Sequence, residues 1–291
     1  MSTCADPDTR SIACFEETSE FDPTHRKYAA YRILNLAAVD RGRLIVERFA
    51  ERARIDGAWA LDVGTGSGGI AIAPAEAGAS VDAIEPDPVR FRWATERVAG
   101  HCVPVRLGSS AGESLPFDAA TFDIVILDSV IEHVENRRKV IRELARVLRP
   151  GGNAYLVSPN KLSVFNILRD PHYAMFGVVL LPRWLGKFYV VRVRGVDRGY
   201  WVNVTPTKRW LLRNLTLGRL EVEQVVQDGF EKLALPGAPF RGPRPVRLVA
   251  RAAVWLGLAS TLQSLAMAQY PAFILLARKE GPASGRWPDT K

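Results

Sequence analysis

The chain has 291 residues, 47% of them hydrophobic, and a formal net charge of +8. This length allows one large domain or two small ones, and the apolar content suffices for a sizeable core. Three cysteines (Cys4, Cys14 and Cys102) without paired spacing argue against a disulfide scaffold or a cysteine zinc site. The N-terminal stretch shows no secretory signal pattern, so we expect a cytoplasmic protein.

The positive charge is concentrated late in the chain. Residues 161–251 carry 16 Lys and Arg against 6 Asp and Glu, whereas the remainder carries 23 against 25. Such a field can attract an anionic substrate, an acidic lipid surface or nucleic acid. Scattered, solvated arginines explain the same numbers.

The predicted elements begin after a polar, acidic stretch, residues 1–25, in which we expect a mobile tail. Apolar spacing over 28–53 predicts one or two helices, with Gly42 as the break. Strands then alternate with helices: we predict strands over 58–63, 80–85, 102–107, 122–128 and 153–158, and helices over 67–78, 87–100 and 135–152, the last ending at its Pro-Gly-Gly. This alternation predicts an α/β fold with a parallel sheet, whose ligands bind beyond the carboxyl ends of the strands.

A glycine-rich loop follows the first predicted strand, in the stretch ALDVGTGSGGIAIA (60–73). The pattern Gly64-x-Gly66-x-x-Gly69 permits a dinucleotide, with its pyrophosphate on the next helix N-terminus and Glu85 on the ribose. Asp62 argues against this ligand, because a carboxylate at the strand end repels phosphate at short range. A cationic ligand without phosphate would instead be attracted by the Asp62 carboxylate.

Four stretches in this order carry a family resemblance: LDVGTGSGG, AIEPD, ESLPFDAATFDIVILDSVIEHVEN and LRPGG. From about Ala58 to Pro159 the chain resembles class I S-adenosylmethionine-dependent methyltransferases. The resemblance implies a Rossmann-like, seven-stranded sandwich with a reversed last strand, and S-adenosyl-L-methionine as cofactor. The remaining core elements are expected in TPTKRWLLRNL (helix), RLEVEQVVQDGF (strand) and PAFILLARK (strand).

On this basis we expect one methyltransferase domain over 26–291, with its core at 56–160 and the completion of the sheet at 205–280. An insertion after the fifth strand, about 160–204, is rich in aromatic and basic residues, and we interpret it as a lid with an acceptor pocket. The alternative is a subdomain that merely packs on the sheet. A second insertion, 236–270, is long enough to cross a membrane, but its polar residues favour a buried or interfacial helix.

The resemblance also implies site residues. Asp62 would bind the methionine end of the cofactor, Gly64 and Gly66 would allow close backbone approach, and Glu85 would bind the ribose hydroxyls. The remaining expected cofactor residues are Thr65, Pro86, Ser110, Ala111, Gly112, Glu113, Asp128 and Ser129. Ala111 departs from the family pattern, which often has an Asp there to bind the adenine amino group, so Ser109, Ser110 or backbone groups would have to substitute.

Methyl transfer to a hydroxyl requires alignment of the acceptor and removal of its proton. His133, just past the fourth strand, and His172, in the first insertion, are the candidate bases; for both, a role in orienting a loop is the alternative. Glu132 and His133 resemble the Glu-His of ubiquinone-biosynthesis-type O-methyltransferases, which suggests a metal-assisted variant. Ser129 stands where those enzymes often carry another acid, so we expect no metal.

The sequence therefore predicts a methyltransferase (EC 2.1.1.-) of secondary metabolism that acts on oxygen of a small hydrophobic or glycosylated molecule. The alternatives are an RNA methyltransferase, a non-catalytic cofactor-binding protein of the same fold, and a dinucleotide oxidoreductase. Nucleic acid is not the expected partner, whereas peripheral association with a membrane is kept open.

Overall fold

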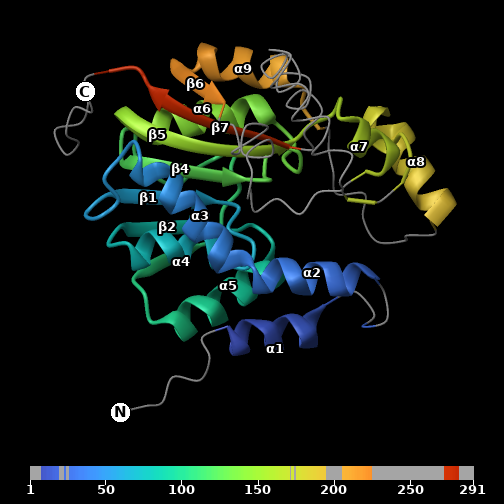
Figure 1. Ribbon diagram of the computed structural model, residues 1–291, viewed down its shortest axis with the longest axis horizontal. Coiled ribbons are helices and arrows are strands. Elements are labelled where there is room, and N and C mark those ends of the chain that lie inside the picture. Colours follow the sequence, from blue (N-terminus) through green and yellow to red (C-terminus); the bar gives the residue numbers. More distant parts are fainter. Residues whose placement is uncertain are drawn as a thin grey trace, which may run out of the picture.

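The computed structural model describes residues 8–19, 23, 26–170, 172–173, 175–194, 205–224 and 272–281. Seven strands form one mixed sheet in the order β3-β2-β1-β4-β5-β7-β6 (Figure 1). In chain order the strands are β1 (Trp59–Val63), β2 (Ser80–Ile84), β3 (Val105–Gly108), β4 (Phe122–Asp128), β5 (Leu148–Pro159), β6 (Leu220–Gln224) and β7 (Ala272–Lys279).

Helices cover both faces of this sheet and its carboxyl edge. They are α1 (Thr9–Thr18), α2 (Arg26–Leu36), α3 (Ala38–Ala50), α4 (Gly69–Glu76), α5 (Pro88–His101), α6 (Arg137–Val147), α7 (Val164–Leu168), α8 (Arg183–Arg194) and α9 (Lys208–Leu217), with a 3-10 turn, η1, at Val178–Leu180. Among the described residues, no helix combines the length and apolar composition that crossing a bilayer requires.

The strand directions confirm the predicted fold. β1 pairs in parallel with β2 and β4, β2 with β3, and β4 with β5. β7 is the reversed strand, antiparallel to both β5 and β6. The result is the Rossmann-like α/β sandwich expected from the sequence.

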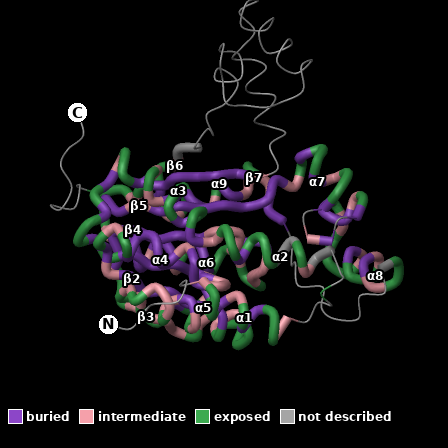
Figure 2. The backbone as a smooth tube through the Cα atoms, turned by 60° about the horizontal axis from the view of Figure 1, so that its bottom comes forward, coloured by how far each residue is buried: buried purple, intermediate pink, exposed green. Residues whose placement is uncertain are grey.

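Two apolar cores lie on opposite faces of the sheet because neighbouring side chains along a strand point to opposite faces. In β4, Val125 and Leu127 belong to the core under α6 and α9, and Ile124 and Ile126 to the core under α3 and α4. Figure 2 shows these strands as almost continuously buried. Their near-continuous apolar sequence is typical of a parallel sheet covered on both faces.

The structure differs from the expected N-terminal tail over Thr9–Thr18, which form α1. Phe15 of this helix is 1% exposed and meets Trp93 of α5 edge-on, with ring centroids 5.1 Å apart. The hydroxyl of Ser11 donates to the Trp93 carbonyl at 3.2 Å. Local polarity concealed this helix because only a few of its residues supply the buried contacts.

Gly42 does not break the helical region as predicted; the interruption lies at Ala37, between α2 and α3. Gly42 is buried inside α3, where an added Cβ would lie 3.0 Å from both the Ala73 Cβ and the Ile70 carbonyl oxygen. The glycine therefore permits close packing of α3 on α4 rather than a turn.

The C-terminal completion of the sheet agrees with the sequence prediction, since α9, β6 and β7 lie in the three expected stretches. The second insertion, 236–270, lies outside the described residues, as do 195–204 of the first. The described part of the first insertion contains α7, η1 and α8, and a small apolar cluster joins Tyr173 and Met175 to Val178 of η1 and Val190 of α8.

Candidate active site

The carboxyl ends of β1, β2 and β4 meet at one edge of the sheet and border a cleft of about 340 Å³. Of the predicted cofactor residues, Gly64, Glu85, Pro86, Ala111, Gly112, Glu113 and Ser129 line it, together with His133. The lining does not include Asp62, Thr65, Gly66, Ser110, Asp128 or His172. No described aromatic residue of the first insertion lines this cleft either, in contrast to the expected aromatic walls.

Asp62 is the penultimate residue of β1, and only 2% of its surface is exposed. Burial raises the pKa of its carboxyl to about 7; the Thr65 hydroxyl and the charge of Arg41 oppose this rise, whereas the carboxylates of Asp128 and Glu85 contribute to it. Its Oδ2 atom accepts no hydrogen bond from the described part of the chain. A buried carboxylate without a cationic partner is costly, so this position suits the positively charged group of a ligand.

The glycine loop brings backbone close to the cleft. Gly64 has φ +70°, and a Cβ added there would lie 2.8 Å from Cγ2 of Val130. Gly66 has φ +59°, but nothing lies within 4 Å of its virtual Cβ, so space opens over this residue. The left-handed backbone explains why glycine occurs at both positions.

Glu85 fixes this loop from the end of β2. Its two carboxylate oxygens accept the backbone N–H groups of Gly66, at 2.8 Å, and of Asp87, at 3.0 Å. Burial raises the pKa of the Glu85 carboxyl. Asp87, not Glu85, caps α5, because its carboxylate accepts the N–H groups of Val89 and Arg90. The remaining lone pairs of Glu85 can accept ribose hydroxyls.

On the adenine side of the predicted site, two side chains bind other parts of the protein. The Ser110 hydroxyl donates to the carbonyl of Ser114 at 2.9 Å. Glu113 accepts the N–H groups of Glu135, at 2.8 Å, and Asn136, at 3.2 Å. Glu113 thus holds the loop that carries His133.

Arg41 of α3 belongs to the site although the sequence reasoning missed it. Its guanidinium forms an ion pair with the Asp128 carboxylate and lies 3.4 Å from the Ser129 hydroxyl. Burial raises the pKa of Asp128, and Arg41 opposes that change. Ser129 has φ +60°, an uncommon left-handed conformation for a non-glycine residue, which turns the chain sharply after β4.

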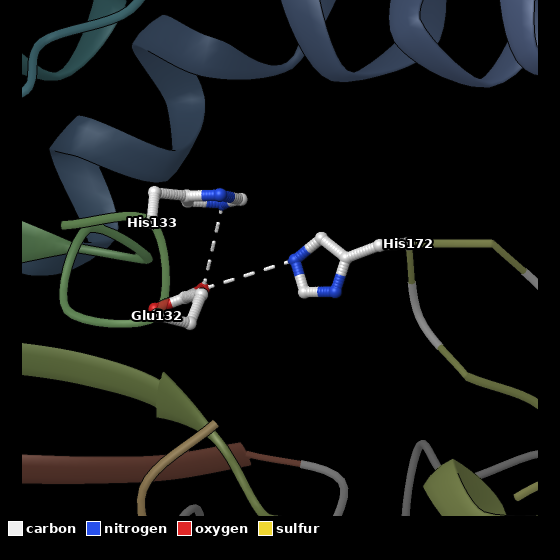
Figure 3. Close-up of side chains that lie close together, drawn as sticks. All are labelled: Glu132, His133 and His172. Atoms are coloured by element: carbon white, nitrogen blue, oxygen red, sulfur yellow. Dashed lines mark ion pairs between the residues drawn. The ribbon is translucent and has the colours of Figure 1, made fainter. Parts of the chain in front are cut away.

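The two candidate bases, far apart in sequence, meet at one carboxyl group (Figure 3). Nε2 of His133 lies 3.9 Å and Nε2 of His172 lies 4.0 Å from Oε1 of Glu132. The two imidazole rings stand nearly perpendicular, with centroids 5.1 Å apart. One potential metal-ligand atom from each of the three residues lies within 4.8 Å of the others. The sequence paired Glu132 with His133 alone, whereas in the structure Glu132 lies between both histidines and is the centre of the cluster.

Glu132 is completely buried, and this burial raises the pKa of its carboxyl to about 8, with a further contribution from Asp128. No other described residue donates a hydrogen bond to its oxygens, and its own backbone N–H and the charge of Arg41 offset the rise of the pKa only in part. The site thus gathers four buried carboxyl groups, those of Asp62, Glu85, Asp128 and Glu132, whereas the guanidinium groups beside them in the described residues are those of Arg41 and Arg90. Such an excess of carboxyl groups favours a cationic ligand.

These features fit S-adenosylmethionine, which carries an ammonium and a sulfonium but no phosphate. Asp62 offers an unpartnered oxygen for the ammonium, Glu85 offers lone pairs to the ribose, and Gly66 leaves space beside them. A pyrophosphate would instead face the buried carboxyl groups at short range. The geometry therefore disfavours a dinucleotide.

Comparison with known proteins agrees with this chemistry. The family model described as "Methyltransferase domain" matches residues 61–156. Ubiquinone biosynthesis O-methyltransferases are 29% identical in Pseudomonas paraeruginosa, over 64% of this chain and 74% of the relative, and 28% identical in Rhizobium rhizogenes, over 58% and 66%. An uncharacterized methyltransferase of Mycobacteroides abscessus is 35% identical over 54% of this chain and 61% of its own. The matched curated relatives are covered over 38% to 74% of their own length.

Solved structures support the fold. The YcgJ protein of Bacillus subtilis has a TM-score of 0.52 at 18% identity, covering 84% of this chain and all of its own. An S-adenosylmethionine-dependent methyltransferase of Mesorhizobium loti has a TM-score of 0.51 at 17% identity, covering 79% and 94%. At these identities the likeness concerns the architecture alone.

Proposed function

Because this chain carries a class I S-adenosylmethionine-dependent methyltransferase domain, we propose that it transfers the methyl group of that cofactor to an oxygen atom of a small organic molecule. One observation carries the proposal: the cofactor-type cleft at β1 and β2 adjoins a Glu132–His133–His172 cluster suited to accept a proton. Binding and proton removal would thus occur side by side.

The binding half of the site consists of Asp62 for the ammonium group, Glu85 for the ribose and the loop from Gly64 to Gly66 for close backbone approach. Arg41, which pairs with Asp128, would receive the cofactor's carboxylate beside the ammonium. When bound, S-adenosylmethionine supplies a methyl group activated by its sulfonium. The protein then has to orient the acceptor and exclude water.

The second half of the site removes the acceptor proton. The cofactor would supply the methyl carbon to the acceptor oxygen, and the electron pair of the broken carbon–sulfur bond would stay on sulfur. The hydroxyl proton passes to the imidazole of His133 or His172. Glu132, adjacent to both imidazoles, would stabilise the resulting cation in its ionised form.

For the acceptor we propose a hydrophobic or glycosylated metabolite, with residues 160–204 acting as a lid. Two of the relatives are named for O-methylation in ubiquinone biosynthesis, which favours oxygen and a small molecule. His172 comes from this insertion and reaches Glu132 on the loop after β4. We further propose a cytoplasmic protein that can associate peripherally with a membrane.

The test is incubation with methyl-labelled cofactor and pooled small metabolites, followed by mass spectrometry of every labelled product. His133→Ala and His172→Ala should each lower kcat by about 10²-fold or more, the usual contribution of a positioned base, with little change in cofactor affinity. His101→Asn is the control, because His101 lies between Asp8 and Glu76, away from the cleft. Label in RNA alone would favour an RNA methyltransferase, and cofactor binding without any labelled product would favour a non-catalytic protein.

A metal-assisted reaction is the second candidate, favoured by the spacing of Glu132, His133 and His172. One carboxylate and two imidazoles suit a divalent transition metal. Isothermal titration with Zn²⁺ and Mn²⁺ should then show one site that Glu132→Gln removes. Full activity after treatment with a strong chelator would reject this candidate.

A further inference from the structure

The insertion after β5 presents an unusual concentration of exposed apolar side chains. Of sixteen large hydrophobic residues exposed in the described part of the chain, nine lie between Leu162 and Val193. Six of these are at least 59% exposed, and we call them the lid surface: Phe165, Leu168, Phe176, Trp184, Phe188 and Val193. Contiguous exposed apolar groups commonly mark an interaction site.

Helix α8 shows that this exposure does not result from a missing core. Val190 is 1% exposed and packs with Tyr173, Met175 and Val178 of the same insertion. Trp184 and Phe188, one helical turn apart, are 73% and 59% exposed. The helix thus has a packed inner face and a second apolar face that points to solvent.

Within residues 161–194, the charged side chains that reach the surface beside these apolar residues are positive. Residues 161–194 contain six Lys and Arg and a single acid, Asp170. Asp170 is 3% exposed, and its carboxylate accepts the N–H groups of His172, at 2.9 Å, and Tyr173, at 2.6 Å. Within residues 161–194, the exposed cations Arg183, Lys187 and Arg192 therefore have no exposed acidic residue beside them.

The insertion lies at one end of the molecule, beyond the carboxyl ends of the strands (Figure 1). Figure 2 shows α7 and α8 as largely exposed. The guanidinium carbon of Arg192 lies 6.0 Å from the centre of the Phe188 ring, so cation and aromatic group reach solvent together. This end can approach a flat partner without obstruction by the sheet.

We propose that the lid surface docks the protein on an anionic phospholipid bilayer. Trp and Phe side chains partition into the interface between headgroups and acyl chains, and neighbouring Lys and Arg bind acidic headgroups. An RNA partner would use the cations but leave the apolar groups in water, and a protein partner would need complementary acids. The docking does not depend on the proposed methyl transfer.

The experiment is cosedimentation of the full chain with phosphatidylcholine vesicles, with and without phosphatidylglycerol, in the absence of cofactor and acceptor. The chain should bind the anionic vesicles, and added NaCl should weaken the binding. Trp184→Ala combined with Phe188→Ala should weaken it by about tenfold or more, because both aromatic groups leave the interface. Leu217→Ala on α9 is the control, since Leu217 is also 73% exposed but lies outside the insertion.

Circular dichroism would verify that all variants fold. The proposal is overturned if anionic vesicles do not bind the chain, or if the double variant binds them as well as the unchanged protein. A dimer in sedimentation equilibrium that the double variant dissociates, without vesicle binding, would assign the surface to a second copy. Binding to homopolymeric RNA but not to vesicles would overturn it as well.

Discussion

Asp62→Asn should make the cofactor-free protein more stable and yet weaken cofactor binding. Burial raises the pKa of this carboxyl from 3.8 to about 7, so between these values the folded state retains a proton that the unfolded state has lost. The unfolding free energy therefore falls as pH rises through this window, and the loss is complete above about pH 7. The difference between the two pKa values corresponds to an upper limit of ~4 kcal/mol.

The neutral amide of the variant does not ionise, so the variant lacks this pH-dependent loss of unfolding free energy. From about pH 5 to about pH 8, the unfolding free energy of the variant should rise by ~3 kcal/mol relative to that of the unchanged protein. Burial of an amide that lacks a partner offsets part of the gain, by ~1–3 kcal/mol at every pH. Urea unfolding at several pH values measures the difference, with Asp56→Asn as control because Asp56 is an exposed partner of Arg54.

Cofactor affinity should change in the opposite direction. The ammonium of S-adenosylhomocysteine requires an ionised Asp62, so affinity for the unchanged protein should fall about tenfold from pH 8 to pH 6, as binding must first release a proton. The variant should bind about 10–100-fold more weakly at pH 8 and show a flatter profile, because a charge-assisted hydrogen bond is lost. Equal pH profiles by calorimetry, or equal affinities, would refute the assignment of Asp62 to the ammonium group.

Three further substitutions test the packing that holds the site. Arg97→Met should lower the unfolding free energy by ~3 kcal/mol or more, because fully buried Arg97 pairs with Asp8 and donates to the Ser67 carbonyl. Arg54→Met, which breaks an exposed pair with Asp56, should cost less than ~1 kcal/mol, and similar melting shifts for both would contradict this view. Gly42→Val should lower stability by ~1–3 kcal/mol by forcing α3 away from α4, and an unchanged urea midpoint would show that this contact is adaptable. Thr207→Ala should cost ~1 kcal/mol in thermal unfolding by removing the N-cap of α9, whereas Thr207→Ser should retain most of it.

The binding half of the site was predictable from sequence because its residues are local to motifs. Asp62 lies near the end of a buried strand, the glycine loop follows that strand directly, and Glu85 follows the next strand. Asp87 and Thr207 cap helices through bonds to N–H groups two or three residues away. Such features depend on backbone conformation and short-range hydrogen bonds, which the residue pattern itself specifies.

The sequence predicted the two histidines of the acid–base cluster as separate candidates, but it did not predict that they lie beside the same carboxyl group. His133 and His172 are separate candidates in the sequence, and nothing in the spacing of 40 residues between Glu132 and His172 indicates that they meet. The position of His172 depends on the apolar cluster of the insertion after β5, to which the next residue, Tyr173, belongs. Tertiary packing, not local sequence, therefore determines where His172 lies.

The chain order of strands, helices and glycine loop determined by itself the layered fold and the type of cofactor, because apolar periodicity and turn chemistry act within a few residues. Only the tertiary structure decided that Arg41 pairs with Asp128, 87 residues away, and that α1 is a packed helix. Charge pairing and burial between distant segments leave no periodic pattern in the sequence, since each depends on where the sheet brings the chain together.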